Sequence, residues 1–566
     1  MGHILNRLKD LFDRRHELAR QMKWLLINSK IILAQLVALF AADLAISGIT
    51  VGGTLLNKRL IDGASGAGHF HWEIFALLVG LTALNITLSA ASRYMEKLLQ
   101  ERMAFSVREK LFEHVLRSRW ENVKERHSGD ILTRLTSDID SIASGITSMI
   151  PNLLSFCFRT VLAFSVLFSF DRFLALAALV LGPLVVLTGL LFSGRLRALH
   201  IQLRENESRY RSFMQESSER ILVIKTFCSE EEYARRLSEI RAERMRLVRA
   251  RGRVSTLMRV SMTLLFNSGY LLAFGWGIFQ ISRGSITYGT MSVFLSLVNQ
   301  VEGPVASIGN IIPSLISVLA SVGRVEELEM VEEEERLAPA ELTNAIGIRF
   351  SRVSFAYEDD EPVLRDVSFE IRPGETVGLV GETGAGKTTA ARLLLALTRP
   401  TEGSIELFDE NGTAETVSAS SRRLIAYVPQ GNTLSSGTIR DNLEPAGKRA
   451  SEDEIREALR CAEAYGFIEE LPKKLDTVIG ENGTGLSEGQ AQRVAIARAL
   501  LRKAPVLILD EASASLDMQT EQKIMENLRT ATSRVTCLVI THRPSMLELC
   551  DRCFKVTGTD IIEVKE

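Results

Sequence analysis

The sequence predicts two structural halves, an all-α transmembrane domain of six helices with long cytoplasmic helical extensions and, after it, a soluble α/β domain. Two observations support this fold class. The long apolar runs all lie before residue 325, and beyond Gly347 short β-rich runs such as PVLILDEAS alternate with helical ones. The length of 566 residues also suits three or four structural units at about 150 residues each.

Composition and charge exclude several classes of protein. The net charge is −2 at pH 7, which gives no bulk attraction to nucleic acid, so no nucleic-acid partner is expected. Six cysteines in 566 residues exclude a disulfide-stabilised scaffold. The membrane character therefore comes from the uneven distribution of apolar residues and not from an unusual overall composition.

Six stretches are long and apolar enough to cross a bilayer, which needs about 20 apolar residues. They are 31–57, 74–91, 153–170, 173–193, 260–282 and 291–322. The alternative, buried helices of a large soluble protein, is disfavoured because uncharged runs of this length are rare outside membranes. Asp43, Arg159 and Glu302 interrupt these runs. For Arg159 and Glu302 two interpretations stay open. One is a contact with substrate or a gate, and the other is an ion pair between helices or a side chain that reaches the membrane surface by snorkelling.

The placement of Lys and Arg predicts the orientation. The segment before the first run and the segments 93–149 and 195–253 are basic, whereas the other connections are short and hold few basic residues. Both termini are therefore expected in the cytoplasm, for a multi-pass protein of a bacterial inner or plasma membrane. The two long segments lack proline and have helix-forming composition, which predicts helical hairpins, one of them turning at 127–130.

The same patterns predict the domain boundaries. Residues 1–30 are amphipathic and are expected to form an N-terminal interfacial helix. Residues 31–325 form the transmembrane domain, 326–345 an acidic linker, and 346–566 the α/β domain.

Residues 381–388, GETGAGKT, match the phosphate-binding pattern G-x-x-x-x-G-K-[ST] between a predicted strand at 376–380 and a helix that begins near Lys387. Backbone N–H groups of such a loop surround a phosphate, and the helix N-terminus adds positive partial charge. Lys387 is expected to reach the β- and γ-phosphates of ATP, and the Thr388 hydroxyl to bind Mg²⁺. The expected nucleotide-binding residues here are Gly381, Glu382, Thr383, Gly384, Ala385, Gly386, Lys387, Thr388 and Thr389.

Two adjacent carboxylates, Asp510 and Glu511, follow the apolar run 506–509. A carboxylate at the tip of such a strand, beside a phosphate loop, can hold Mg²⁺, and the next one can act as a general base toward water. We therefore expect Asp510 to be a metal ligand and Glu511 to be catalytic in ATP hydrolysis.

With these motifs in this order, nearly the whole chain resembles the ATP-binding cassette (ABC) superfamily, specifically half-transporters of the type IV exporter class. The resemblance identifies the α/β half as a P-loop NTPase of the ABC ATPase type. It implies that Tyr357 in FAYED stacks on adenine and that Gln430 in YVPQ contacts Mg²⁺ and takes part in catalysis. It also implies that His542 in VITHR is the catalytic switch histidine at the γ-phosphate.

LSEGQ, residues 486–490, resembles the signature motif of the family. The resemblance implies that Ser487, Gly489 and Gln490 contact an ATP molecule bound mainly by a second half-transporter, so that the active form is a dimer. Glu488 departs from the usual glycine and would repel phosphates. A homodimer that tolerates Glu488 is favoured, and the catalytic half of a heterodimer is the alternative.

The resemblance implies an ATP-driven exporter or flippase, that is, an ATPase coupled to transmembrane movement. ATP binding would close the paired ATPase domains, and hydrolysis would return the transporter to its inward-facing state. Segments 128–139 and 219–231 resemble cytoplasmic hairpins that carry coupling helices in the family. An ATP-gated channel or regulator is a less favoured alternative because Glu511, Gln430 and His542 are intact. The sequence does not identify the exported substrate.

Overall fold

The computed structural model describes residues 15–564 apart from 67–69, 125, 127, 336–341, 343–344, 358–361, 383, 445–449, 481–482, 532–534, 544–546 and 549. The chain divides into two compact units. The first, called here the helical unit, comprises Met1–His114 and His127–Met330, and the second, the α/β unit, comprises Val115–Arg126 and Val331–Glu566.

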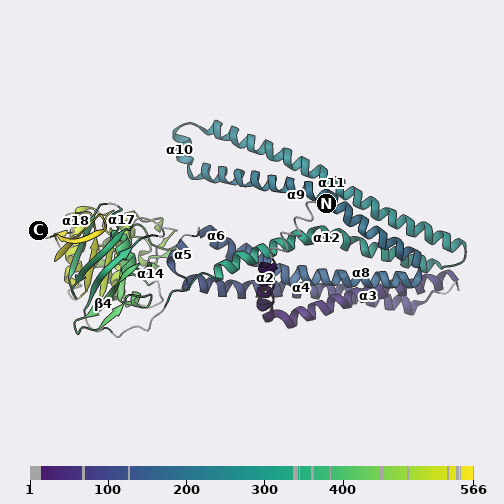
Figure 1. The fold of residues 1–566 in the computed structure, drawn as a ribbon, viewed down its shortest axis with the longest axis horizontal. Helices are drawn as coiled ribbons and strands as arrows, with labels where there is room; N and C mark the ends of the chain where they lie inside the picture. Colours follow the sequence, from purple (N-terminus) through teal and green to yellow (C-terminus); the bar gives the residue numbers. More distant parts are fainter. Residues whose placement is uncertain are drawn as a thin grey trace. The chain divides into compact units, whose positions relative to one another are not determined.

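Long helices build the helical unit (Figure 1). They are α2 (Arg15–Ser29), α3 (Leu33–Gly66), α4 (Trp72–Arg117), α8 (Ile150–Phe170), α9 (Arg172–Glu219), α11 (Glu230–Ser282) and α12 (Tyr288–Glu329). The longest, α11, has 53 residues. At about 1.5 Å per residue this is more than twice the ~30 Å needed to cross the hydrocarbon core. Such helices continue beyond the bilayer, as the composition of the two basic segments predicts.

Four stretches of the described residues are long and apolar enough to cross a membrane. They are Ala19–Ser65, Trp72–Arg117, Gly129–Phe170 and Glu230–Ser282. Each contains one of the predicted spans. The other two predicted spans, 173–193 and 291–322, lie within the continuous helices α9 and α12, and their passage through the membrane stays a prediction.

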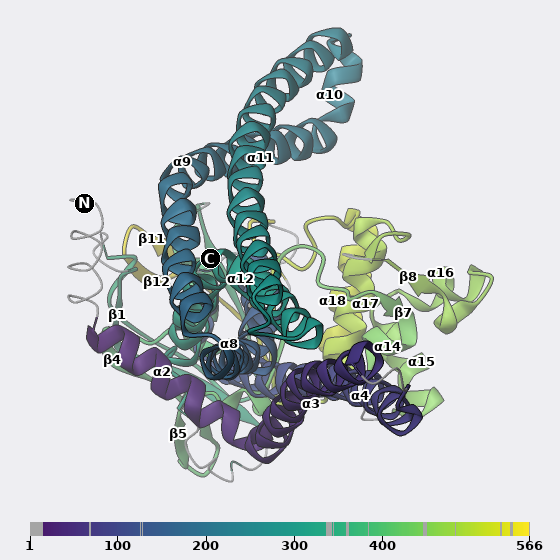
Figure 2. The same cartoon turned by 90° about the vertical axis from the view of Figure 1, so that its right-hand side faces the viewer.

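Helices α9 and α11 lie side by side as a long hairpin whose tip is the short helix α10, Ile221–Thr226 (Figures 1 and 2). This tip falls within segment 219–231, where the sequence predicts a coupling helix. A buried cluster joins α8, α9, α11 and α12. It consists of Ala163, Leu167, Leu174, Ala175, Ala273, Val293, Phe294 and Leu297.

The segment before α8 corrects the predicted turn at 127–130. Ser128–Thr133 is helical (α6), so residues 128–130 are not a turn, while residue 127 lies outside the described residues. The short helix α5, Trp120–Lys124, comes before them. Helix α7 (Ile139–Ser144) follows, with one π-helical turn on each side, η2 (Arg134–Asp138) and η3 (Gly145–Met149). The His-Ser-Gly-Asp sequence resembles a turn because Ser and Asp also favour the first turn of a helix.

The carboxylate of Asp138 ties this segment to α12. Arg324 Nε donates to Oδ2 at 2.8 Å, and Ser321 Oγ donates to Oδ1 at 2.9 Å. Burial alone would raise the pKa of Asp138, but hydrogen bonds from Arg324 and Ser321, with the charges of Arg324 and Arg134, outweigh it and lower the pKa. The ionised carboxylate is therefore the form that the fold stabilises.

Two larger sheets form the centre of the α/β unit. The first has the order β12-β11-β3-β10-β9-β6, and its strands are parallel except for β12. Its strands are β3 (Thr376–Gly381), β6 (Ile425–Val428), β9 (Val506–Asp510), β10 (Thr536–Ile540), β11 (Arg552–Thr557) and β12 (Asp560–Val564). The second sheet is antiparallel, in the order β2-β1-β4-β5. Its strands are β1 (Ile346–Phe355), β2 (Leu364–Ile371), β4 (Glu402–Asp409) and β5 (Ala414–Thr416).

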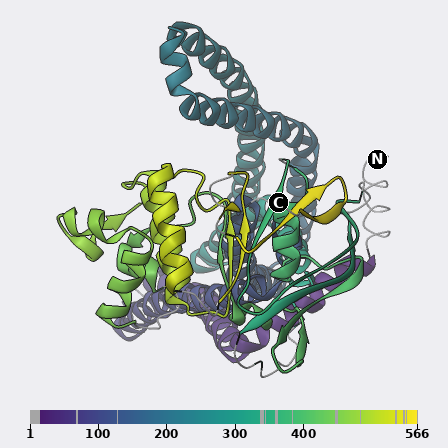
Figure 3. The ribbon, with the colours of Figure 1, turned by 90° about the vertical axis from the view of Figure 1, so that its left-hand side faces the viewer.

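Besides α5, six described α-helices and a two-stranded ladder belong to the unit. They are α13 (Lys387–Leu394), α14 (Ile439–Leu443), α15 (Glu452–Cys461), α16 (Tyr465–Glu470), α17 (Glu488–Leu501), α18 (Met518–Ala531), β7 (Gly437–Thr438) and β8 (Val478–Ile479). Figures 2 and 3 show α14–α18 gathered on one side of the unit and β1, β4 and β5 on the other.

The parallel strands separate two hydrophobic cores because successive side chains of a strand point to opposite faces. Leu507 and Leu509 of β9 belong to the core shared with α14–α18. Val506 and Ile508 belong to the core shared with α13 and the antiparallel sheet. Burial on both faces explains why these strands are continuous apolar runs in the sequence.

We expect Asp138→Asn to lower the stability of the helical unit by about 1–3 kcal/mol, because Arg324 would lose its charged acceptor. Since folding lowers the pKa of Asp138, the stabilisation is present at neutral pH and should decline as the pH falls below about 5. Thermal melting of the detergent-solubilised protein between pH 7 and pH 4 measures both effects.

The matched control for this prediction is Asp140→Asn. Asp140 pairs with Arg108 at 2.8 Å, but its side chain is 56% exposed, so its loss should cost about 1 kcal/mol or less. Equal melting temperatures of the two variants at pH 7 would contradict the role given to Asp138.

Candidate functional site

Adjacent parallel strands bring the predicted site residues to one edge of the six-stranded sheet. The phosphate loop follows β3, Asp510 ends β9, and Glu511 comes next. His542 lies two residues beyond the end of β10, and Gln430 two residues beyond β6. Ligands of open α/β sheets bind beyond the carboxyl ends of the strands, so this edge is the candidate site.

The phosphate loop has a backbone conformation that depends on glycine. Gly384 has a φ of 87° and Gly386 a φ of 100°, both in the left-handed region. A Cβ on Gly386 would also lie 2.8 Å from Cγ1 of Val363. The loop leads directly into α13, whose first backbone N–H groups have no intrahelical partner. Loop and helix together form an anion-binding site.

The described part of the loop holds Lys387 in place. Its Nζ atom donates to the carbonyl oxygens of Gly381 at 2.7 Å and Glu382 at 2.8 Å, and the side chain is buried. Ala385 donates its N–H to the Glu382 carbonyl at 3.1 Å, which closes the turn. Thr383, also predicted as a nucleotide-binding residue, lies outside the described residues. The ammonium group is therefore positioned inside the loop.

The donor set around Asp510 fits a Mg²⁺ ion. Asp510 is fully buried, and its Oδ2 accepts a hydrogen bond from the Tyr427 hydroxyl at 3.1 Å. Its Oδ1 is buried and has no hydrogen-bond partner among the described residues. Burial raises the pKa of Asp510 and the nearby charge of Glu511 adds to this, whereas hydrogen bonds from Tyr427 and Thr388 oppose it. Mg²⁺ prefers oxygen ligands, and a buried carboxylate oxygen beside the Thr388 hydroxyl supplies them.

Two predicted catalytic side chains converge on Glu511. Gln430 Nε2 donates to Oε2 at 2.5 Å, and His542 Nδ1 lies 3.6 Å from Oε1. Glu511 itself has a φ of 48°, in the left-handed region, and its N–H donates to the Ile540 carbonyl at 2.9 Å. Such a conformation costs about 1–3 kcal/mol in a residue other than glycine and is often found at functional sites.

Sequence reasoning missed two residues that hold the segment after Glu511. Gln492 of α17 is buried, donates to the Glu511 carbonyl at 3.1 Å and accepts from the Ser515 N–H at 3.3 Å. Arg543 donates to the carbonyls of Leu516 at 3.0 Å and Ala514 at 2.7 Å. Gln492 could have been found in the sequence as the one polar residue among the apolar residues of one face of α17.

The signature segment caps its own helix. The Ser487 hydroxyl accepts from the Gln490 N–H at 3.3 Å, and the Gln490 side chain accepts from the Ser487 N–H at 2.9 Å. Helix α17 therefore begins at Glu488. A Cβ on Gly489 would lie 2.8 Å from the Ser515 carbonyl, so only glycine fits there. Ser487 and Glu488 are exposed, and this end of the helix is accessible to another molecule.

Tyr357 is fixed through its hydroxyl group. It accepts from Arg392 Nη1 at 3.1 Å and lies 3.2 Å from the Thr389 hydroxyl. Arg392 also places its guanidinium 5.3 Å from the ring centre of Trp120 in α5. Arg392, which no sequence motif indicates, thus connects the predicted adenine-stacking residue to α5.

The acidic segment after α12 is paired and not merely solvated. Ser118 forms an antiparallel β-bridge with Glu333, and the Arg119 N–H donates to the Glu332 carbonyl at 3.0 Å. The Glu334 carboxylate accepts from both Nη atoms of Arg422, at 2.7 and 2.8 Å. Helix α12 continues to Glu329, so the first residues of the predicted linker are helical.

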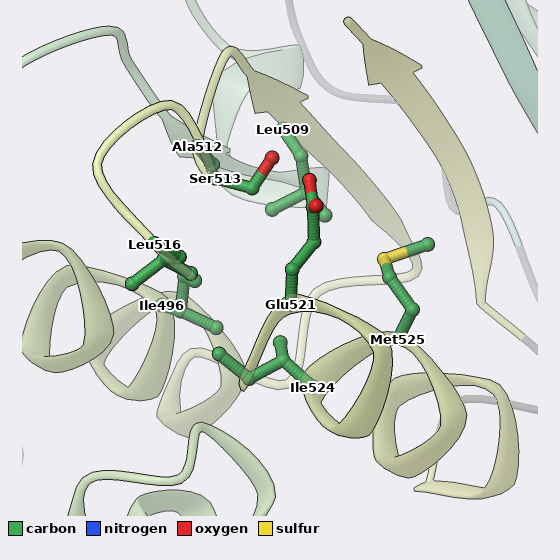
Figure 4. A pocket seen from close by; sticks show the side chains of 8 residues that line it. All are labelled: Ile496, Leu509, Ala512, Ser513, Leu516, Glu521, Ile524 and Met525. Carbon is green, nitrogen blue, oxygen red and sulfur yellow. The ribbon is translucent and has the colours of Figure 1, made fainter. Parts of the chain in front are cut away.

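A small cavity lies behind the turn after β9, between α17 and α18, and contains none of the predicted site residues (Figure 4). It is lined by Ile496, Leu509, Ala512, Ser513, Leu516, Glu521, Ile524 and Met525. The Ser513 and Glu521 oxygens point to the same end of it in Figure 4, and Arg543 Nη1 lies 3.2 Å from Glu521. This apolar cavity belongs to the packing of the α/β unit.

Comparisons with known proteins agree with this geometry. Residues 36–305 match the family described as ABC transporter transmembrane region, and residues 364–514 match the family described as ABC transporter. The chain is 32% identical over 468 residues to the ATP-dependent lipid A-core flippase of Syntrophus aciditrophicus, covering 82% of this chain and 77% of that protein.

Two further proteins are similar over most of their length. An ATP-binding/permease protein of Staphylococcus aureus, named for multidrug export, is 30% identical over 477 residues, 83% of this chain and 82% of that protein. The solved structure of a bacterial Atm1-family ABC exporter with ATP bound has the same fold, with a TM-score of 0.77 and 23% identity. That likeness covers 94% of this chain and 95% of the other.

We expect Arg392→Ala to weaken ATP binding about tenfold or more, because losing a charged donor to the Tyr357 hydroxyl costs about 1.5–3 kcal/mol. Arg392→Lys keeps a cation near Trp120 but lacks the planar guanidinium, so it should lose less affinity. Titration of the purified variants with a fluorescent ATP analogue measures the affinities. An unchanged affinity in Arg392→Ala would show that Tyr357 needs no support from Arg392.

Proposed function

This chain belongs to the ABC transporter family, and on that premise we propose how its residues couple ATP to export. It is a multi-pass membrane protein with a nucleotide-binding ATPase domain, and it acts as an ATP-driven exporter or flippase. The convergence of Gln430 and His542 on Glu511, beside the phosphate loop, is the observation that best supports a hydrolytic cycle. A channel or regulator would need nucleotide binding but not this arrangement.

In the proposed site, the N–H groups of residues 384–389 and the Lys387 ammonium bind the phosphates of ATP, and Tyr357 stacks on the adenine. Thr388, Asp510 and Gln430 would hold Mg²⁺, which neutralises charge on the phosphate oxygens when bound. The orphaned Oδ1 of Asp510 supports this assignment.

Glu511 acts as the general base of the proposed reaction. Its carboxylate accepts a proton from the attacking water, while Gln430 and His542 hold the carboxylate in place. Gln492 and Arg543 support the segment behind it and are positioning residues. The His542 side chain is 61% exposed, so it can also reach a γ-phosphate.

We propose that the ATP site is completed by a second copy of this chain. One chain carries one phosphate loop and one signature segment. The exposed Ser487 and the half-buried Gly489 and Gln490 would contact the ATP held by the partner. A helix N-terminus favours an anion at this point. Glu488 at the same point favours the alternative, in which this chain is the catalytic half of a heterodimer.

ATP binding then favours the closed dimer because both chains contact the nucleotide only in that state, and hydrolysis removes the advantage. Short helices α5 and α10 transmit the movement to the membrane-spanning helices. We further propose that residues 1–30 lie at the membrane interface, that 326–345 serve as a linker, and that both termini face the cytoplasm of a bacterial inner or plasma membrane.

A reconstitution experiment tests the dimer. We expect the chain, purified alone and placed in lipid vesicles, to hydrolyse ATP with Mg²⁺, and its rate per chain to fall on dilution in detergent as dimers separate. Activity that appears only when a second half-transporter is added would support the heterodimer. Activity of an isolated monomer would contradict the shared site.

We expect Glu511→Gln to reduce kcat for ATP hydrolysis by about 10²–10⁴, because the amide cannot accept a proton from water. ATP binding should persist, since the phosphate loop is unchanged. Lys387→Ala is the contrasting variant and should lose binding as well as turnover. Phosphate release and nucleotide binding, measured on the same samples, separate the two. Full turnover in Glu511→Gln would remove Glu511 from its proposed role.

A further inference from the structure

The partners of the Asp43 carboxylate in the described structure are uncharged. Asp43 of α3 is the single charged residue of the first predicted span. Its Oδ1 accepts from the Ser92 hydroxyl of α4 at 3.0 Å, and its Oδ2 from the Ser155 hydroxyl of α8 at 3.5 Å. Helices α3, α4 and α8, labelled in Figure 1, therefore meet at this side chain.

Two other carboxylates of the helical unit, by contrast, have a basic partner. Asp62, farther along α3, pairs with Lys58 at 3.3 Å, and Asp138 pairs with Arg324. Among the ion pairs between described residues, none includes Asp43. Arg159 lies four residues beyond Ser155 on α8, but its Nε is buried without a hydrogen-bond partner and it forms no ion pair with Asp43 in the described structure.

A carboxylate at membrane depth costs about 2.5–3.5 kcal/mol on insertion scales. Two hydroxyl donors offset part of this cost, at about 1 kcal/mol each, but they add no positive charge. Each carboxylate oxygen can accept a second hydrogen bond, so the group retains acceptor capacity toward a cation. Asp43 is also half-buried and not sealed in the core, which leaves it accessible.

Apolar side chains flank Ser155 along α8. Ser155 lies on α8 near Leu154 and Phe158, which are 48% and 40% exposed. An aromatic face and a carboxylate together suit a cation that carries apolar groups.

We propose that Asp43, oriented by Ser92 and Ser155, binds the positively charged group of the transported substrate, and that the substrates include amphipathic organic cations. This inference rests on the proposed export function and adds the chemical class of the substrate. Ser92 and Ser155 are positioning residues in it, since they act through the carboxylate.

The test uses two probes of the same shape and opposite charge, tetraphenylphosphonium and tetraphenylborate. Equilibrium binding of each is measured on the purified full-length protein in detergent, without ATP. We expect the wild-type protein to bind the cation at least tenfold more tightly than the anion. Asp43→Asn keeps an acceptor for one serine but removes the charge, so the preference should fall about tenfold. Asp43→Glu should restore part of it.

The matched control is Asp62→Asn, the same substitution on the same helix at a carboxylate that already has Lys58 as its partner. It should keep the preference for the cation. Equal binding of both probes by the wild-type protein, or a preference that survives in Asp43→Asn, would overturn the proposal. If Asp43 instead pairs with Arg159, the double variant Asp43→Asn/Arg159→Gln would melt above either single variant, which would also overturn it.

These outcomes are separate from a failure of the proposed export function. Loss of the charge preference in a protein that still hydrolyses ATP counts against the Asp43 site alone. A wild-type protein that binds the cation but never hydrolyses ATP counts against the pump and leaves the binding site standing.

Discussion

The chemistry of this protein depends on the close alignment of four buried strands. Because β3, β10, β9 and β6 are parallel and adjacent, the residues that follow them meet at one edge of the sheet. Lys387, Asp510, Glu511 and His542 come from distant parts of the sequence, and only this alignment brings them together. Burial on both faces keeps the strands in register, so the hydrophobic cores determine the geometry of the polar edge.

Local patterns were sufficient to predict the main parts of this site. The phosphate loop is a contiguous motif whose glycines are required by backbone conformation, and the carboxylates follow a recognisable apolar strand. Gln430 and His542 came from resemblance to a family, and the structure places both beside Glu511. The assignment of roles to these residues remains a prediction.

Contacts between distant segments could not be read from the sequence. The importance of Arg392 and Gln492 depends on which strand end or loop each one faces. The apolar face around Gln492 indicates a buried polar residue but not its partner. The prediction of a turn at 127–130 was wrong at residues 128–130 for a related reason. Serine, glycine and aspartate are common both in turns and at the starts of helices. The length and hydropathy of the apolar runs identified the long helices. No pattern in the sequence indicated the π-helical turns before α8.

The β-bridge between Ser118 and Glu333 has a mechanical consequence. It fastens together the backbone just after α4 and the backbone just after α12, and Arg422 anchors the second of these through Glu334. The segments that follow α4 and α12, which are far apart in the sequence, are thus joined by backbone hydrogen bonds. Because both of these segments belong to the α/β unit, the chain enters that unit from α4 and from α12 through two backbones that are already joined.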